Sequence, residues 1–377
     1  MNRLYKTLLS GLFVALASAA MASTVWYVNG GNGSDTNTCT SSTAACKTIE
    51  RAISLASSGD TISVAAAKYA ENLTIGISLT ILGSGASTAI IDGGSKARVV
   101  TISGGVANVI LSRLTIQNGL AIGGGGILNS GNTLAIRYSV ITSNQASASC
   151  SVRQNCYSWG GGVYNSGTLT ITNTTLSGNS ARVSCSPNPC YDSTDGGGIY
   201  NLGRMTITNS TLSGNLAWHS LGLGFGRGGA ISNRGAATIS NSTLSGNAAN
   251  SGGGINNYTG YNVVLQNSLV ANSSSGGNCL GTMTSNGYNL SSDGTCSFTH
   301  AGDMNNTDPM LGPSQNNGGP TNTMALPSGS PALDAGNPNG CTDGLGNLLK
   351  TDQRGQPRPD PEDAGGCDIG AYERQSD

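Results

Sequence analysis

The sequence predicts an all-β protein, a right-handed parallel β-helix in which short coils stack into a solenoid. Three observations predict this fold: a unit recurs five times, each unit holds two short runs of alternating apolar and polar residues, and Gly-rich joints separate the units. One unit has too few apolar side chains to form a core alone, so the units must stack. Helical repeats are excluded because glycine and β-branched residues disfavour helices.

The repeats differ in length because insertions separate them. Their starts lie 36, 36, 32 and 24 residues apart, whereas the shared unit has about 22 residues, a length typical of solenoid repeats. In the unit GGGVYNSGTLTITNTTLSGNSA, we expect Leu169, Ile171 and Leu176 to point inward and the threonines outward, because side chains alternate along a strand. The five units begin at Gly124, Gly160, Gly196, Gly228 and Gly252.

Asparagines recur in register and form three rows along the repeats. Asparagine tolerates the left-handed backbone of tight turns, and stacked amides can bond one another from coil to coil, each bond contributing roughly 1 kcal/mol. We therefore interpret the rows as structural ladders, in preference to N-x-[ST] glycosylation acceptors. The rows are Asn129, Asn165, Asn201, Asn233 and Asn257; Asn173, Asn209, Asn241 and Asn267; and Asn144, Asn179, Asn215, Asn247 and Asn272.

Residues 1–22 have the pattern of a secretory signal peptide. Arg3 and Lys6 give a positive start, a short apolar run follows, and residues 20–22 offer a small-residue cleavage site. The run is too short to span a bilayer, and no later segment is apolar enough. We expect a cleaved, secreted or cell-surface protein without a transmembrane segment.

Between the signal peptide and the repeats, residues 23–59 form an N-terminal segment that ends in a predicted helix. Apolar residues recur at helical spacing between Lys47 and Ser57, and Gly59 follows. We expect this helix to cover the open apolar end of the solenoid. Coils are expected from residue 60 to residue 275, with early strands over residues 60–65, 79–82, 89–91, 99–102 and 109–116.

Composition and charge exclude several classes of protein. Removal of Arg3 and Lys6 leaves 16 of the 18 basic residues against 19 acidic ones. Nucleic-acid binding needs a basic stripe, so no nucleic-acid partner is expected. Glycine supplies 57 of 377 residues without a three-residue period, which excludes collagen. The regular spacing of Ile, Val and Leu argues against disorder.

The ten cysteines indicate disulfides rather than a metal site. They all follow the signal peptide, and an even number in an oxidising compartment suggests pairing. Local couples are the simplest proposal, although spacing does not fix the connectivity. Metal binding is the weaker alternative, because the chain has no CxxC and two histidines, His219 and His300, and no cofactor is expected. The couples are Cys39 with Cys46, Cys150 with Cys156, Cys185 with Cys190, Cys279 with Cys296, and Cys341 with Cys367.

The joint GG[GA]I-x-N, followed later by SGN, carries a resemblance to known families. The coils resemble the pectate-lyase-like right-handed β-helix superfamily, and the joint is similar to the repeats of polymorphic outer membrane proteins. Those repeats usually have Phe where this chain has Leu176, Leu212 and Leu244. The resemblance implies an exported bacterial protein, either released or retained at the surface by other contacts.

Residues 276–377 look like the region called a choice-of-anchor Q domain. Three phrases carry this likeness: NGGPTNTMALPSGSPALDAG from Asn317, TDQRGQPRP from Thr351 and CDIGAYE from Cys367. Charged residues concentrate here, which fits a cation site or a docking signal. We prefer an irregular, ion-paired cap, closed by Cys341 and Cys367, because the far end of a solenoid also needs covering.

The residues of the coils, and not their fold, decide whether catalysis is expected there, because one fold can serve many functions. Glycoside hydrolysis usually needs two carboxylates, and a calcium-assisted lyase needs several oxygen ligands. Between Gly93 and Ser292 the acidic residues are Asp192 and Asp195 alone, both in one insertion. No catalytic residue is assigned. A polysaccharide lyase or glycoside hydrolase remains the alternative, with Asp192, Asp195 and His219 as an unrecognised site.

Three insertions, at residues 147–159, 182–195 and 218–227, fall at the same joint of successive coils. They should emerge side by side and gather rings and arginines, which suit recognition of a glycan or an extracellular protein. The alternative is that the rings only cover the solenoid edge. The predicted binding residues are Arg153, Tyr157, Trp159, Arg182, Tyr191, Asp192, Asp195, Trp218, His219, Phe225 and Arg227.

Two further alternatives do not involve a ligand bound by the inserted loops. The outward rows of Thr170 with Thr172 and Thr206 with Thr208 resemble those of ice-binding solenoids, although strand propensity explains them better. A structural envelope protein without a specific ligand is the other alternative. The sequence favours binding of glycan or protein through the inserted loops.

Overall fold

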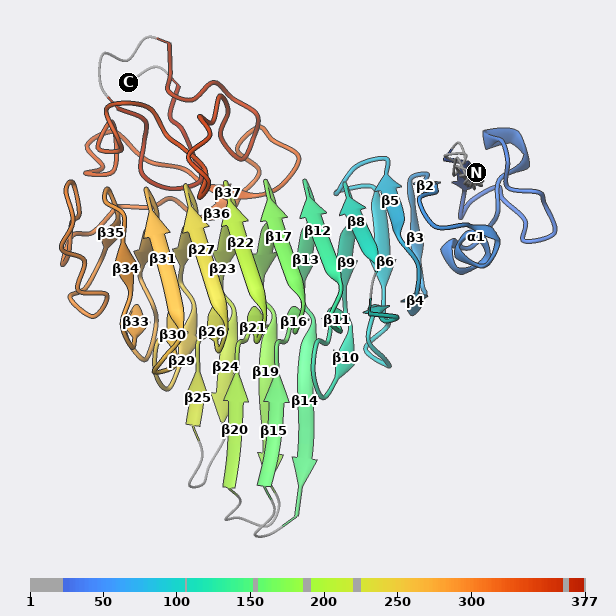
Figure 1. The fold of residues 1–377 in the computed structure, drawn as a ribbon, viewed down its shortest axis with the longest axis horizontal. Coiled ribbons are helices and arrows are strands. Elements are labelled where there is room, and N and C mark those ends of the chain that lie inside the picture. Colours follow the sequence, from blue (N-terminus) through green and yellow to red (C-terminus); the bar gives the residue numbers. More distant parts are fainter. Residues whose placement is uncertain are drawn as a thin grey trace, which may run out of the picture.

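The chain winds into a single column of stacked coils, a right-handed parallel β-helix, which confirms the predicted fold (Figure 1). The computed structural model describes residues 23–105, 107–151, 155–185, 191–219, 225–361 and 366–375. Strands of successive coils pair in parallel in three long sheets, here called A, B and C. Residues 1–22, the predicted signal peptide, lie outside the described residues.

Sheet A is the longest of the three. Where one strand was expected over residues 109–116, two form, because Arg113 adopts a left-handed backbone (φ 57°) and turns the chain into the next sheet. The strands of sheet A, in order, are β1 (Val25–Val28), β2 (Thr61–Val64), β5 (Leu79–Gly83), β8 (Asn108–Ser112), β12 (Thr133–Arg137), β17 (Thr168–Thr172), β22 (Arg204–Thr208), β27 (Ala236–Ser240), β31 (Asn262–Gln266) and β34 (Thr284–Ser285).

Sheets B and C complete each coil, and both continue past residue 275, the predicted end of the coils. Sheet B contains β3 (Ala67–Tyr69), β6 (Ala89–Asp92), β9 (Thr115–Gln117), β13 (Val140–Thr142), β18 (Thr175–Ser177), β23 (Thr211–Ser213), β28 (Thr243–Ser245), β32 (Leu269–Ala271) and β35 (Leu290–Ser291). Sheet C contains β4 (Leu73–Ile75), β7 (Val100–Ile102), β11 (Ile127–Asn129), β16 (Val163–Asn165), β21 (Ile199–Asn201), β26 (Ile231–Asn233), β30 (Ile255–Asn257) and β33 (Cys279–Leu280).

The core is a continuous apolar column inside the three sheets. Leu169, Ile171 and Leu176 are fully buried, as predicted from their alternation with threonine. Each stacks on the matching residue of the neighbouring coils; Leu169, for example, lies in register between Leu134 and Met205. Full burial of such a side chain contributes about 1.5–3 kcal/mol, so the stacked coils share one source of stability.

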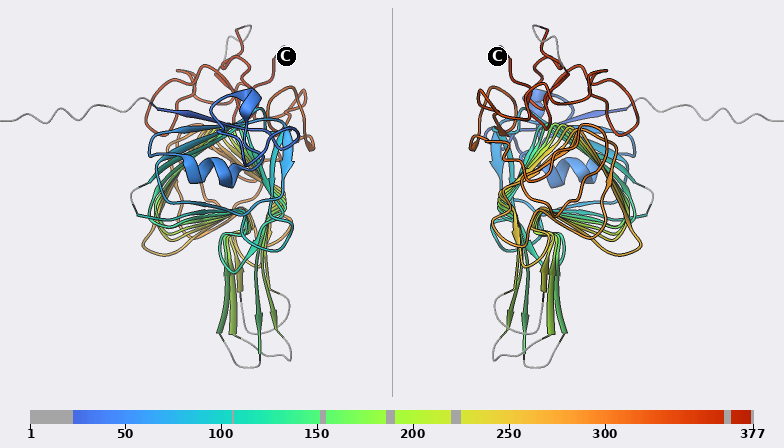
Figure 2. Two further views of the ribbon diagram at one scale, coloured as in Figure 1. Left: turned by 90° about the vertical axis from the view of Figure 1, so that its right-hand side faces the viewer. Right: turned by 90° about the vertical axis from the view of Figure 1, so that its left-hand side faces the viewer.

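A helix lies across the N-terminal end of the column, as predicted (Figure 2, left). Helix α1 (Ile49–Leu55) follows the short 3₁₀ helix η1 (Ser42–Ala44), and it begins where the Thr48 side chain accepts a hydrogen bond from the Arg51 amide. It is shorter than expected because Ala56 is extended. Its buried residues Ile49 and Ala52 join the core of the first coils.

Two of the asparagine rows form ladders between coils. In the first, the amide of Asn129 donates to Asn165 at 2.7 Å, and the same bond recurs through Asn201 and Asn233 to Asn257. In the third row, Asn144, Asn179, Asn215 and Asn247 are linked by bonds of 3.0 Å. Asn272 does not continue this row, because the register of Ala271 with Ser245 places Asn272 opposite Gly246.

The middle row differs from the expected ladder. Asn173, Asn209 and Asn241 have left-handed backbones, with φ between 46° and 50°. Their amides donate outward to backbone carbonyls of the C-terminal region instead of to one another; Asn173, for example, bonds the carbonyl of Asp352 at 3.0 Å. Asn267 does bond Asn241, at 2.9 Å. The amides therefore fix a distant segment to the column.

That distant segment is the tail, residues 311–375, which lies along one side of the column instead of capping its far end (Figure 1). Within residues 311–361 and 366–375, the tail contains one short hairpin, β36 (Ser314–Gln315) with β37 (Thr323–Met324), and is otherwise irregular. Phe298, which follows the last coil, is buried at the end of the core. The predicted terminal cap is therefore wrong in position, because the tail satisfies the side-facing amides of the coils.

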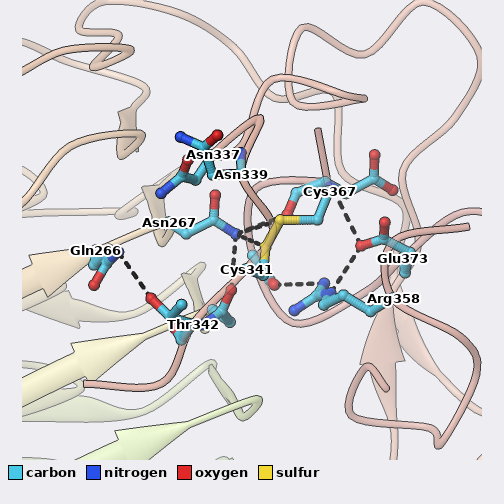
Figure 3. Close-up of a disulfide and its surroundings, with 12 residues drawn as sticks. Gln266, Asn267, Asn337, Asn339, Cys341, Thr342, Arg358, Cys367 and Glu373 are labelled. Carbon is cyan, nitrogen blue, oxygen red and sulfur yellow. Dashed lines mark hydrogen bonds and ion pairs between the residues drawn. A yellow bond between two sulfur atoms is a disulfide. The ribbon is translucent and has the colours of Figure 1, made fainter. Parts of the chain in front are cut away.

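Buried polar contacts hold the tail in place (Figure 3). The amide of Asn267 contacts the Cys341–Cys367 disulfide and donates to the carbonyl of Asp368 at 2.9 Å. Nearby, Arg358 and Glu373 form a fully buried ion pair of 2.7 Å, and Arg358 also donates to Asn209 at 3.1 Å. Burial raises the pKa of Glu373 to about 7, although Arg358 opposes this shift.

The tail also covers part of the outward threonine rows. A loop around Gly344 and Leu345 lies over Thr170, Thr206 and their neighbours on sheet A, and Thr208 is buried. These threonines therefore do not form the open flat surface that ice binding would need.

The inserted residues build a two-layered fin that projects from the side opposite the tail (Figures 1 and 2). One layer of the fin is sheet D, which extends a sheet of short strands at one turn of the coils. The other layer is sheet E. Small buried side chains such as Ala146, Ala181 and Val183 face the interior of the fin. Sheet D contains β10 (Leu120–Ala121), β14 (Gln145–Cys150), β19 (Ser180–Cys185), β24 (Leu216–His219) and β29 (Ala248–Ala249), and sheet E contains β15 (Asn155–Trp159), β20 (Tyr191–Asp195) and β25 (Phe225–Arg227).

Disulfides join neighbouring cysteines, as predicted. Four couples are bonded, and Cys150–Cys156 links the two layers of the fin. The fifth proposed couple, Cys185 with Cys190, cannot be placed because Cys190 lies outside the described residues. No helix in the described ranges is long and apolar enough to cross a membrane. The other three bonds are Cys39–Cys46, Cys279–Cys296 and Cys341–Cys367.

Candidate functional site

Two rows of side chains run along the outer face of sheet E. Each row takes one side chain from each coil of the fin. Parallel pairing places Trp159, Asp195 and Arg227 in one row. The second row holds Tyr157 and Phe225 with Ser193 between them. Alternation turns the intervening residues into the fin, where Ser158 and Thr194 are buried. The register of the insertions therefore aligns aromatic and charged groups.

Sheet C of the column supplies the second wall. The middle residue of each three-residue strand points away from the core, because its neighbours are the core residue and the ladder asparagine. In successive coils these residues are Tyr164, Tyr200, Ser232 and Asn256. The two walls meet where the fin leaves the column, and we call the hollow between them the corner. The corner has a volume of about 380 Å³ and is lined by Tyr157, Trp159, Ser193, Asp195, Tyr200, Arg227 and Arg234.

One half of the corner is aromatic. The Trp159 ring stacks on Tyr157, with centroids 5.5 Å apart and planes 9° apart, and on Tyr200, with centroids 6.1 Å apart and planes 17° apart. Tyr164 packs against Trp159 edge to face at 6.4 Å. Burial raises the pKa of Tyr164 and Tyr200, so both phenols stay neutral. Tyr157 is 42 % exposed, which leaves ring surface open to a ligand.

The other half of the corner holds a buried carboxylate that is satisfied by hydroxyl groups. Asp195 accepts hydrogen bonds from Tyr258 at 2.7 Å, Ser193 at 2.8 Å and Ser232 at 3.2 Å. Burial, followed by the charge of Asp195, raises the pKa of Tyr258, which therefore remains a donor. These contacts fix Asp195 as part of the wall.

Two arginines complete this half and are held mainly by rings. The guanidinium of Arg234 lies 3.8 Å above the centre of the Tyr258 ring. Arg227 lies 4.9 Å from the centre of Phe225 and donates to the Tyr258 hydroxyl at 3.0 Å. Among the described residues neither arginine forms an ion pair with Asp195, and the Nε of Arg234 has no hydrogen-bond partner, so at least one donor remains for a ligand.

The fin separates residues that the sequence grouped into one binding surface. Tyr157, Trp159, Asp195, Phe225 and Arg227 share the outer face of sheet E. Arg182 and Trp218 instead lie in register on the outer face of sheet D, on the opposite side of the fin. His219 follows Trp218 and faces the fin interior by alternation. The expectation that all these residues gather at one surface is therefore wrong.

Three predicted site residues cannot be assigned a role. Arg153 lies outside the described residues, and the side chains of Tyr191 and Asp192 are not described, although their backbones belong to β20. No three His, Cys, Asp or Glu side chains within the described ranges are placed to hold a metal ion.

Sequence reasoning missed Tyr164, Tyr200, Arg234 and Tyr258. A signal for the first two was available, because the joints GGGVYN and GGGIYN place tyrosine at the outward position of the strand. Arg234 and Tyr258 follow the ladder asparagines Asn233 and Asn257 directly, a position that looks like an ordinary turn. The turns of Arg234 and Tyr258 face the fin because of the angle between the fin and the column, and the sequence does not indicate this angle.

The solved structures that are similar to this chain share little sequence identity with it. No family model matches the sequence, and no curated protein matches it. The crystal structure of pectate lyase Pel9A is similar over 93 % of this chain and 96 % of that chain, with 14 % identity and a TM-score of 0.45. A rhamnogalacturonan lyase structure is similar over 71 % and 68 %, with 9 % identity and a TM-score of 0.33. Function is therefore inferred from the residues of the corner.

Proposed function

We propose that this chain is an exported protein that binds a glycan in the corner between the fin and the column. The observation that carries the proposal is the joining of an aromatic wall to two arginines in one open hollow. The apolar faces of sugar rings pack on aromatic rings, and sugar hydroxyls accept hydrogen bonds from guanidinium groups. Tyr157 and Trp159 supply the first contact, and Arg227 and Arg234 supply the second.

The order of the residues suggests how such a ligand would lie. Trp159, Asp195 and Arg227 come from successive coils, which are spaced roughly 4.8 Å apart. An extended chain parallel to the axis of the column would contact the rings at one end and the arginines at the other. The ordered strands and the Cys150–Cys156 bond would reduce the entropy lost on binding.

Export is part of the proposal because the disulfides fit an oxidising compartment. Four couples are bonded, and disulfides persist mainly in secreted or surface proteins. The signal-peptide pattern of residues 1–22 supports the same location.

Binding is favoured over glycoside hydrolysis by the state of the carboxylate. Hydrolysis usually needs an acid and a second carboxylate facing the bond to be cleaved. Asp195 is the one carboxylate among the described residues that line the corner, and three hydroxyl groups already occupy it.

A screen of the mature chain on an immobilised glycan array tests the proposal. We expect retention of the wild type on a subset of glycans, at least ten-fold weaker retention of Trp159→Ala, and no release of cleaved product. Trp218→Ala is the matched control, because Trp218 is exposed on the opposite face of the fin. Absence of retention on any glycan, or equal loss in the two variants, would contradict binding in the corner.

A further inference from the structure

The disulfide Cys341–Cys367, here called the tail disulfide, lies beside two contacts that fix the tail to the column (Figure 3). Cys341 directly precedes Thr342, whose carbonyl accepts a hydrogen bond from the amide of Asn241 at 2.6 Å. The carbonyl of the residue after Cys367 accepts a hydrogen bond from the amide of Asn267 at 2.9 Å. Two segments of the tail that are 26 residues apart in sequence therefore bind the column side by side.

The tail disulfide holds these two segments at the spacing of the coils. Asn241 and Asn267 occupy the same turn in adjacent coils, which lie roughly 4.8 Å apart. The Cα atoms of the bonded cysteines are 6.0 Å apart, close to that spacing. Without the bond, docking alone would have to bring the two segments together, and the entropy lost on closing this loop would oppose docking.

The contacts between the tail and the column are mainly polar. Three side-facing asparagines of the column, Asn173, Asn209 and Asn241, bond carbonyls that lie inside the loop closed by the tail disulfide. By contrast, the apolar cluster that the described tail residues share with the column contains two buried column residues, Leu269 and Leu290. Docking therefore depends on carbonyls that must be presented in the right order, and the tail disulfide restricts the loop that presents them.

The column does not need the tail for its own core. The buried members of the main apolar cluster lie between Val28 and Phe298, and within the described ranges this cluster includes no residue of the tail. If the tail left, the side-facing amides of the column would bond water instead. The column can therefore be folded while the tail is undocked.

In the docked tail the disulfide itself is covered. Cys341 is 1 % exposed and Cys367 is fully buried, and the amide of Asn267 contacts their sulfur atoms at 2.9 and 3.7 Å. Reduction requires a thiolate to reach one of the two sulfurs, so access affects its rate. The fin disulfide, Cys150–Cys156, is more open, because Cys156 is only half-buried. A reductant should therefore reach the fin disulfide before the tail disulfide.

We propose that the tail docks on the column only after the tail disulfide has formed, and that docking then protects this bond from reduction. In the forming step, the thiols of Cys341 and Cys367 transfer two electrons and two protons to a small disulfide such as oxidised glutathione, which becomes two thiols while the new S–S bond forms. In a reducing compartment the tail stays undocked. The inference does not depend on glycan binding in the corner, so the two proposals can fail separately.

The double variant Cys341→Ser with Cys367→Ser tests whether docking needs the bond. We expect protease to cleave its tail faster than the wild-type tail, by roughly ten-fold or more, while circular dichroism still shows a folded β-helix. Cys39→Ser with Cys46→Ser is the matched control, because that disulfide is also buried but lies beside β1. We expect the tail of the control to resist protease.

Three results with these variants would overturn the proposal. The first is a resistant tail in the variant that lacks the tail disulfide, and the second is equal cleavage of the tail in the two variants. The third is an unfolded column in the variant that lacks the tail disulfide, because the proposal requires the column to fold without the docked tail.

A pulse of reductant on the wild type tests the protection without any substitution. The reductant is used at a concentration that opens the fin disulfide, free thiols are tagged with a maleimide polymer, and the tagged molecules are then exposed to protease. We expect every molecule with free thiols at Cys341 and Cys367 to have a cleavable tail. Molecules that have both free thiols and a resistant tail would contradict the proposal.

Discussion

The two sides of the column show how one scaffold can carry a closed face and an open face. On the tail side, the outward amides of Asn173, Asn209 and Asn241 are occupied by backbone carbonyls of the tail. On the fin side, the outward row of Trp159 and Arg227 borders a hollow that the described residues leave open. Substitutions on the tail side should therefore change stability, and those in the corner should change binding.

The largest expected effect is the loss of the buried ion pair in the tail. At pH 8, Arg358→Ala leaves Glu373 buried without a counter-charge, so the carboxyl group either stays ionised without its partner or takes up a proton, and removing one partner of such a pair typically costs about 3–5 kcal/mol. Chemical denaturation with limited proteolysis of the tail measures the change. Arg113→Ala is the control. Arg113 is exposed, and it lies at the turn of an earlier coil that corresponds to the turn of Asn173. Equal stability of the two variants would show that the tail is not held by this pair.

A smaller effect is expected from pH. The folded pKa of Glu373, about 7, lies above its usual value of 4.5. This group therefore contributes stability that is fully present below pH 4.5 and is lost as pH rises through 7, by at most about 3 kcal/mol. Unfolding measured between pH 5 and pH 8 should show this decline in the wild type and not in Glu373→Gln. An unchanged slope in the variant would remove Glu373 as the cause.

The smallest stability effect concerns one contact between tail and column. Asn209→Gly keeps the left-handed backbone but removes the bonds to the Thr351 carbonyl and to Arg358. We expect a loss of about 1–3 kcal/mol, the usual cost of leaving buried groups unsatisfied. Asn272→Gly, at an exposed left-handed turn outside the tail, is a comparison for the backbone change alone. If the tail of Asn209→Gly resists protease as well as the wild-type tail does, the conclusion that this row of asparagines holds the tail to the column is contradicted.

The sequence was sufficient to predict the interior of the column, because that pattern is local. The alternation of Leu169 and Ile171 with threonine predicts which side chains face inward, and both are buried. The partner of Asn173 could not be predicted, because it lies 179 residues away and contributes a backbone carbonyl, which leaves no pattern in the sequence. An asparagine row is compatible with a ladder or with a docked segment.

The corner was predictable only in part for a related reason. The insertions could be aligned, so the sequence predicted that Trp159 and Arg227 lie on insertions that emerge side by side. The fin, however, turns Trp218 to the far side and brings Tyr200 and Tyr258 of the column into the site. The angle between an insertion and its scaffold depends on packing between layers, which periodicity does not describe.

Calorimetric titration with the best-retained oligosaccharide tests most directly whether the corner binds while the tail side stabilises. The wild type, Trp159→Ala, Trp218→Ala and Asn209→Gly would be measured under conditions where all four are folded. We expect affinity to fall at least ten-fold in Trp159→Ala and to stay within two-fold in the other variants, a difference of about 1.4 kcal/mol or more. A comparable fall in Trp218→Ala or Asn209→Gly would contradict the division between the two sides.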